Sequence, residues 1–341
     1  MSKLDTFRDL FAHNDWAWAR LSTLCTGLSD EQLDRPFEMG EGSLRETINH
    51  LWSAERVWLD RWKRSATPRY RGSSAGVTVQ QLVEENRELA AERAAFLDGL
   101  TDESLDQVIH YTNTKGTPNE FALRDMMLHV TNHGVHHRAQ AVNMLRHVGA
   151  EVPKPGLDYI FYRLDLQAAG SGPPTLDIET VRTYYEYGDW ARDEVHAAAA
   201  NLSDAQLDRP FELGLGTLRK TLLHIRFAEQ WWLDNWLLGP GNLFPETDER
   251  TTLAELRVLF AETARVRNLY LSRMNDADLA KLVSAQPRPG VTRTFSLGET
   301  MLQLCTHGAH HRAQALNMLR HIGATVPALD VLVMRSPRVF G

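Results

Sequence analysis

The amino-acid sequence predicts an all-α protein built from two tandem four-helix bundles. Three observations lead to this prediction. A whole domain is repeated within the chain of 341 residues, each copy carries four helix-length segments without strand-like alternation, and each copy holds a set of histidines at helical spacing. Of these, the repeat organises the others, because a missed repeat changes the interpretation of the whole fold.

The repeat is visible in two long matching segments. LSDEQLDRPFE at 28–38 returns as LSDAQLDRPFE at 202–212, and HGVHHRAQAVNMLRHVGA at 133–150 returns as HGAHHRAQALNMLRHIGA at 307–324. Both pairs are offset by 174 residues, so each copy is a domain rather than a short solenoid unit. The stretch 168–174, AAGSGPP, has the composition of a linker. We therefore predict domains at 1–168 and 177–341, joined by a linker at 169–176.

The first three helices of the first copy follow from stop and start signals. A segment over 5–27 is rich in Trp and Leu, and Pro36 with glycines at 40 and 42 interrupts the chain after it. Ser43 is a suitable N-cap for a second helix that runs to about Lys63. Thr78 is placed to open a third helix over 78–99.

The fourth helix is predicted over 119–148 from an apolar stripe at intervals of three or four residues. Its members are Leu123, Met126, Val130, Ala141, Met144 and Val148. Gly149 follows, a residue suited to a left-handed helix C-cap. Four helices per copy are most simply arranged as a bundle.

Composition and charge exclude several classes of function. With 43% hydrophobic and 24% charged residues the chain is globular. No segment has the length and apolarity of a signal peptide or a membrane span, which makes the cytoplasm the expected location. A net charge of −7 and a pI of about 6.1 provide no basic surface for nucleic acid or an anionic membrane, so we expect small-molecule chemistry, with a small-molecule substrate, or protein contacts. Two cysteines exclude a disulfide framework and a thiolate-rich zinc site.

Histidine is the residue type that remains for metal binding. Fourteen are present, and ten of them form pairs across the repeat. These pairs are His50/His224, His133/His307, His136/His310, His137/His311 and His147/His321. Only such paired residues can serve a function common to both copies.

The spacing of the paired histidines predicts an interior metal site. His133 and His137 lie four apart on one helix face and continue its apolar stripe, and His50 lies on the inward stripe of the second helix. Neutral imidazoles in a core need partners for both ring nitrogens, and a divalent ion provides one. An HxxxH pair alone is more often a pair of hydrogen-bonded core histidines. Both triads persist, however, although the copies have diverged elsewhere.

The segments NHLWSAERVWLDRW and TNHGVHHRAQ closely resemble the DinB family of the DinB/YfiT-like superfamily, in both copies. The resemblance implies four-helix metalloproteins in which one His on the second helix and an H-x-x-x-H-R-x-Q motif on the fourth bind the ion. The matching positions here are His50, His133 and His137, then His224, His307 and His311. Ala139 and Ala313 stand where the family often has Gly. One Zn²⁺, Ni²⁺ or Fe²⁺ is expected per domain, with a coordination position left open.

The resemblance also implies an activity. Characterised relatives include thiol S-transferases and a thiol-dependent isomerase that use low-molecular-weight thiols, and an open metal site suits such chemistry. A metal-dependent hydrolase and a non-catalytic metal-binding or stress-response protein remain alternatives. Single-copy relatives commonly form dimers, so we expect the two halves to pack as an intrachain pseudo-dimer and the chain to be a monomer.

The residues that flank the triads have competing interpretations. His136 and His310 turn away from the ligand next to them, and simple exposure is favoured over a role at the rim of the site. Arg138 and Arg312 suit either an anionic group of a substrate or a bridge between helices, of which the bridge is favoured. Glu55 and Glu229 suit either an acid or base at a cleft or an ion pair, and no role is assigned to them. The tryptophans and Cys305 are interpreted as packing residues. No catalytic residue is therefore predicted.

Overall fold

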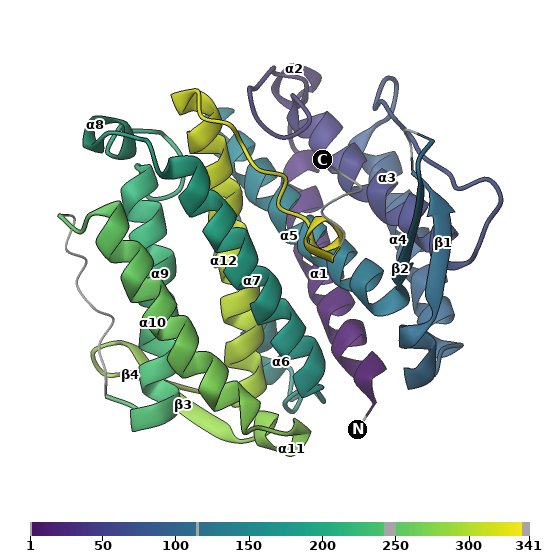
Figure 1. Ribbon diagram of the computed structural model, residues 1–341. Helices are drawn as coiled ribbons and strands as arrows, with labels where there is room; N and C mark the ends of the chain where they lie inside the picture. Colours follow the sequence, from purple (N-terminus) through teal and green to yellow (C-terminus); the bar gives the residue numbers. More distant parts are fainter. Residues whose placement is uncertain (1, 114–115, 242–249, 336–341) are drawn as a thin grey trace. The chain divides into compact units, whose positions relative to one another are not determined.

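The computed structural model describes residues 2–113, 116–241 and 250–335 and is mainly helical (Figure 1). It divides into two compact units, which are described separately. The N-terminal unit comprises Thr6–Leu157 with Leu329–Gly341, and the C-terminal unit comprises Asp158–Ala328 with Met1–Asp5. The domain limits predicted above describe the sequence repeat and remain a prediction. Within the described ranges, no helix combines the length and the hydropathy that crossing a bilayer requires.

The N-terminal unit is a bundle of four long helices. These are α1 (Lys3–Thr26), α3 (Leu44–Trp62), α4 (Val79–Asp98) and α5 (Leu123–His147). Short elements complete it: α2 (Asp30–Leu33), a 3₁₀ helix (Asp102–Asp106), strands β1 (Val108–Thr112) and β2 (Pro118–Ala122), and α13 (Val331–Arg335). Leu21, Leu44, Ile48, Leu82 and Met144 are fully buried in its core. The predicted bundle is confirmed.

The C-terminal unit repeats this arrangement. Its long helices are α7 (Ile178–Ala199), α9 (Leu218–Leu238), α10 (Leu253–Ser272) and α12 (Leu297–Ile322). The other elements are α6 (Tyr159–Ala168), α8 (Asp204–Leu207), α11 (Asp276–Leu279), β3 (Leu282–Arg288) and β4 (Val291–Ser296). The most extensive helix contacts here join α12 to α7 and to α9. The fourth long helix is therefore the centre of the unit.

The predicted N-caps are confirmed. The Ser43 hydroxyl accepts a hydrogen bond from the backbone N–H of Glu46 at 3.2 Å, and Thr78 caps α4 in the same way through Gln81 at 3.1 Å. Each cap satisfies one of the backbone donors that a helix leaves unpaired at its start. At the far end of α5, Gly149 adopts the left-handed φ of 71° that the sequence predicts.

The prediction of a fourth helix from residue 119 is wrong at its start. Residues 118–122 form β2, which pairs antiparallel with β1 from Thr112↔Pro118 to Val108↔Ala122. The equivalent hairpin of β3 and β4 contains an irregularity between Ala285 and Arg288. Five to seven residues are too few for a clear alternating pattern, and the pairing partner supplies the hydrogen bonds that a helix would otherwise make. The helix begins only where the ladder ends.

The repeated LSDxQLDRPFE segment has a structural role. In the N-terminal unit Arg45 donates to Asp34 at 2.6 Å and also pairs with Asp30, with its side chain only 10% exposed. In the C-terminal unit Arg219 pairs with Asp208 at 2.7 Å. These bonds fasten the short helix before α3 or α9 to the bundle, and they account for the presence of the segment in both copies.

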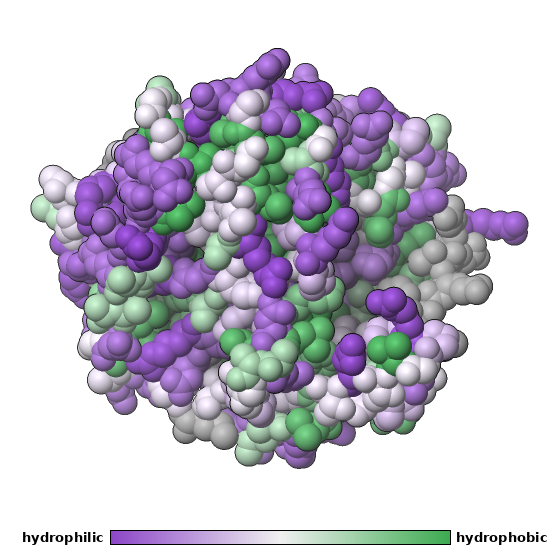
Figure 2. Space-filling model, turned by 180° about the vertical axis from the view of Figure 1, so that it is seen from behind, coloured by the Kyte–Doolittle hydropathy of each residue, from purple (hydrophilic) through white to green (hydrophobic). Residues whose placement is uncertain are grey.

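Figure 2 shows a surface on which hydrophilic residues are spread widely and hydrophobic residues form small separate groups between them. The most exposed large hydrophobic side chains among the described residues include Leu238 (76%), Leu282 (71%) and Val258 (67%). They lie on different elements, so they do not by themselves mark a single binding surface.

Candidate metal centres

The structure brings the predicted histidines together in two triads. In the N-terminal unit, α3 supplies His50 and α5 supplies His133 and His137. In the C-terminal unit, α9 supplies His224 and α12 supplies His307 and His311. Within each triad, one ring nitrogen from every residue lies within 4.8 Å of the other two. The helical spacing of four therefore places both histidines of the fourth helix on the face that meets the second helix.

The geometry of the nitrogens fits a small metal ion. Nε2 of His50 lies 3.0 Å from Nε2 of His133, and the matching atoms of His224 and His307 lie 3.1 Å apart. Two imidazole nitrogens bound to one tetrahedral Zn²⁺ at about 2.0–2.1 Å are roughly 3.3 Å apart. The rings of His133 and His137 are 4.3 Å apart between centroids, and one ring nitrogen of His137 lies within 4.8 Å of those of the other two ligands. The donor set is thus suited to a borderline ion such as Zn²⁺ or Ni²⁺.

Burial keeps the triads in the protonation state that a metal requires. Desolvation lowers the pKa of His133 and His137 well below the usual histidine value, and neighbouring imidazoles lower it further. The pKa of His307 and His311 is lowered well below that value for the same reasons. Burial also lowers the pKa of the two histidines from the second helix, although nearby carboxylates oppose the effect there. Neutral rings offer a lone pair to an ion.

A glutamine one turn beyond the last ligand orients the site. In the C-terminal unit, Nδ1 of His311 donates to Oε1 of Gln314 at 2.8 Å, and the amide of Gln314 contacts His310 at 3.0 Å. This bond holds the tautomer in which Nε2 of His311 is free of its proton. Gln140 makes the equivalent contact with His136 at 3.1 Å. The sequence interpretation missed this role, although the glutamine belongs to the H-x-x-x-H-R-x-Q motif.

The predicted role of Arg138 agrees with its contacts. Its guanidinium is buried and donates to Oδ1 of Asn14 on α1 at 2.8 Å, which bridges the first and fourth helices. Its counterpart Arg312 is also buried and lies 5.6 Å from the ring centroid of Tyr187 on α7. In both units the arginine after the last histidine therefore faces the first long helix of the bundle.

The two glutamates of the second helices form buried ion pairs. Glu55 pairs with Arg93 of α4, and Glu229 pairs with Arg267 of α10 at 3.1 Å. Each arginine also pairs with an aspartate of the first helix, Asp15 or Asp189. Both guanidinium groups are almost completely buried, at 3% and 2% exposed. Of the two alternatives considered for Glu55 and Glu229, these contacts favour the ion pair.

Both cysteines are buried in the cores of their units. Burial raises the pKa of Cys25 to about 12 and raises that of Cys305 further. A thiol with so high a pKa provides almost no thiolate at neutral pH. The interpretation of Cys305 as a core residue is consistent with this environment.

An aromatic wall leads from the first triad to the β1–β2 hairpin. The Trp58 ring lies 4.8 Å from His129, which precedes His133 by one helical turn, and 5.2 Å from Tyr111 of β1. The guanidinium of Arg61 covers Trp58 at 4.5 Å from the ring centroid. The sequence interpretation missed Tyr111 because it missed the hairpin, and it treated Trp58 as a packing residue only.

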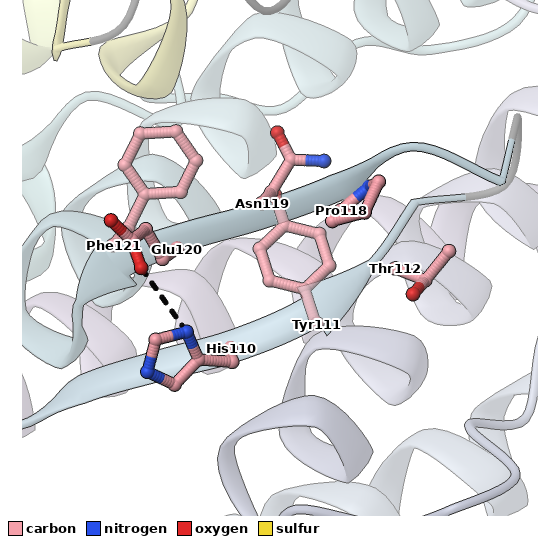
Figure 3. Close-up of a pocket in the computed structure, with 7 residues that line it drawn as sticks. All are labelled: His110, Tyr111, Thr112, Pro118, Asn119, Glu120 and Phe121. Atoms are coloured by element: carbon pink, nitrogen blue, oxygen red, sulfur yellow. Dashed lines mark ion pairs between the residues drawn. The ribbon is translucent and has the colours of Figure 1, made fainter.

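The hairpin itself carries an open hollow of about 530 Å³. Figure 3 shows its lining, in which His110 of β1 faces Glu120 of β2. Their side chains form an exposed ion pair at 3.2 Å. None of the triad histidines lines this hollow, so it is separate from the candidate metal site.

The two triads differ at their edges. Glu41 lies 4.0 Å from Nε2 of His50, and His129 lies 5.6 Å from His133 between ring centroids. The residues at the matching positions of the C-terminal unit are Leu215 and Gln303. The N-terminal site therefore has more ionisable groups around the same three imidazoles.

Comparison with known proteins finds the same family model in both halves of the chain. The model of the DinB family matches residues 1–165 and again residues 175–338. Among solved structures, a DinB-like protein from Bacillus cereus is 19% identical, with a TM-score of 0.35, and the match covers 43% of this chain and 93% of that one. No curated protein matches.

Proposed function

This chain belongs to the DinB family in both of its halves, and from that premise we propose that it is a metal-dependent enzyme that transfers a low-molecular-weight thiol to a small electrophilic molecule. The convergence of three imidazole nitrogens within 4.8 Å, twice in the chain, is the observation that carries the proposal. Three protein ligands leave a coordination position free, which distinguishes catalytic zinc sites from structural ones.

Access to the N-terminal triad supports a catalytic role. The side chain of His50 is 21% exposed and Glu41 beside it is 41% exposed, so the site meets solvent on the α3 side. A divalent ion there would lower the pKa of a bound thiol or water and so supply a nucleophile near neutral pH. His50, His133 and His137 would hold it. The location in the cytoplasm and the monomeric state remain predictions.

A panel of small electrophiles tests the proposal. The full chain is loaded in turn with Zn²⁺, Ni²⁺ or Fe²⁺ and assayed with and without a low-molecular-weight thiol. We expect turnover that requires both the metal and the thiol. The double variant His133→Ala/His307→Ala should have no turnover. His147→Ala, which removes an imidazole from the last turn of α5, is the matched control and should retain activity.

The alternatives give different results in the same assay. Turnover with water alone would identify a metal-dependent hydrolase, because water replaces the thiol as nucleophile. Metal binding without turnover on any electrophile would favour a non-catalytic metal-binding protein. Either result would contradict the thiol-transfer proposal.

A further inference from the structure

Each repeat ends in a segment that packs on the fourth long helix of the other repeat. After Leu157 the chain enters the C-terminal unit, where α6 packs on α12, and after Ala328 it returns to the N-terminal unit, where α13 packs on α5. The end of the first repeat and the end of the second are therefore exchanged. Each contact lies within a single compact unit, the contact of α6 in the C-terminal unit and that of α13 in the N-terminal unit.

The two exchanged segments are well anchored. In α6, Tyr159 is fully buried and Arg163 pairs with Glu299 of α12 at 2.7 Å, with both side chains at most 3% exposed. In α13, Val331 and Leu332 are at most 1% exposed, and the helix packs on α5. These contacts bury apolar and charged groups to an extent that a loosely attached tail would not.

Each segment delivers an aspartate to the same position of a fourth helix. Asp330, which precedes α13, accepts a hydrogen bond from Nδ1 of His129 at 2.8 Å. Asp158, the N-cap residue of α6, accepts from Nε2 of Gln303 at 3.5 Å, and Oε1 of Gln303 accepts from the backbone of Ile160 at 2.8 Å. His129 and Gln303 occupy matching positions in the repeat.

That position adjoins the candidate metal site. His129 and Gln303 lie four residues before His133 and His307, and thus one helical turn from the first ligand of the fourth helix. The ring of His129 is 5.6 Å from that of His133 and 4.8 Å from Trp58, between centroids. The ligand nitrogens of the triad lie within 4.8 Å of one another, and His129 is not part of this group. His129 therefore borders the candidate metal site.

We propose that the segment at the end of each repeat completes the metal site of the other repeat. Asp330 positions His129 beside the triad of the N-terminal unit. Asp158 positions Gln303 beside the triad of the C-terminal unit. This inference rests on the proposal that the triads bind metal. Asp330 and Asp158 are positioning residues, because they act through the side chain that each of them holds. Each site therefore depends on a segment that the other repeat contributes.

Cobalt(II) binding to the full chain tests this proposal. In the His307→Ala background only the N-terminal site binds, and its Co²⁺ affinity and visible absorption spectrum are recorded. Adding Asp330→Ala should lower the affinity about ten-fold and alter the spectrum, as is typical when residues that orient a metal site are lost. Asp330→Asn, whose side-chain oxygen can still accept from Nδ1 of His129, should retain most of both properties.

The second site is the internal control. In the His133→Ala background, Asp330→Ala should leave Co²⁺ binding unchanged, whereas Asp158→Ala should weaken it. An unchanged affinity and spectrum at the N-terminal site after Asp330→Ala, or equal losses at both sites, would overturn the proposal. If the His307→Ala chain bound no Co²⁺ before any aspartate was changed, the metal proposal and this inference would both fail.

Discussion

Nε2 of His50 lies 3.0 Å from Nε2 of His133, although 83 residues separate the two in the chain. The same separation and nearly the same distance, 3.1 Å, relate His224 to His307. Two bundles have thus kept one interhelical contact between imidazoles while the residues around it diverged. Two neutral rings at this distance can hydrogen-bond to each other, and a metal ion bound at both nitrogens would take the place of that bond.

Metal content provides the first prediction. The full chain should bind two ions, and His133→Ala should remove about one of them because it removes an inward-facing ligand. His136→Ala should leave the content unchanged, because the Nε2 of that residue contacts Gln140 instead. Elemental analysis after dialysis measures both variants, and equal losses would contradict the assignment of ligands.

The second prediction concerns the glutamine that orients His311. Gln314→Met keeps the length of the side chain but cannot accept the proton of Nδ1. Zn²⁺ affinity at the C-terminal site should fall about ten-fold. Competition with a chromogenic chelator in the His133→Ala background measures this site alone. In the His307→Ala background the same substitution should have no effect, since Gln314 lies in the other unit.

The third prediction is a pH dependence of stability caused by His196. Burial lowers its pKa to about 4, and neither ring nitrogen has a hydrogen-bond partner within the described part of the chain. Between about pH 6.5 and pH 4 the unfolded state binds a proton that the folded state does not, so stability falls as the pH falls through this window. Between about pH 6.5 and pH 5 this proton should lower the free energy of unfolding of the parent chain by about 2 kcal/mol. Urea unfolding should show that His196→Leu does not have this part of the pH dependence.

A control for His196 comes from the repeat. Ser22 occupies the matching position in the first copy and is also buried. Ser22→Ala removes a group that does not titrate in this range, so it should leave the pH dependence unchanged. Parallel curves for His196→Leu and the parent chain would show that His196 is not the cause.

The fourth prediction concerns the buried pair of Arg163 and Glu299. Arg163→Met leaves the carboxylate of Glu299 buried without its cation, which should lower the free energy of unfolding by about 3 kcal/mol. Replacing both residues, with Glu299→Gln added, should recover part of that loss because no uncompensated charge remains. Urea unfolding at pH 7 measures the free energy of unfolding of the parent chain, Arg163→Met and the double variant. If Arg163→Met were as stable as the parent, the prediction would be wrong.

The fifth prediction is the quaternary state. The two halves belong to one chain, which keeps them at an effective concentration in the millimolar range, so the full chain should be a monomer of 38.7 kDa whose halves pack as a pseudo-dimer. A fragment of residues 1–170 should dimerise or aggregate through its exposed apolar face. Light scattering measures both, and a fragment that is a stable monomer would contradict the pseudo-dimer.

Sequence reasoning predicted much of the fold and the two candidate sites because their determinants are local or periodic. Ser43 and Thr78 cap the helices that they were expected to cap, since capping depends on residues three positions apart. His133 and His137 could be placed on one face from the helical repeat alone. The internal duplication reduced the fourteen histidines to ten paired ones, and helical spacing together with the family motif selected six of these.

Tertiary structure decided the features that depend on distant partners. Residues 118–122 became a strand because residues 108–112 pair with them, and Trp58 became part of a wall because Tyr111 reaches it from that hairpin. Asp330 meets His129 across 201 residues. No periodic pattern encodes such a contact, because it forms only when packing brings the two segments together and its stabilising energy depends on their burial.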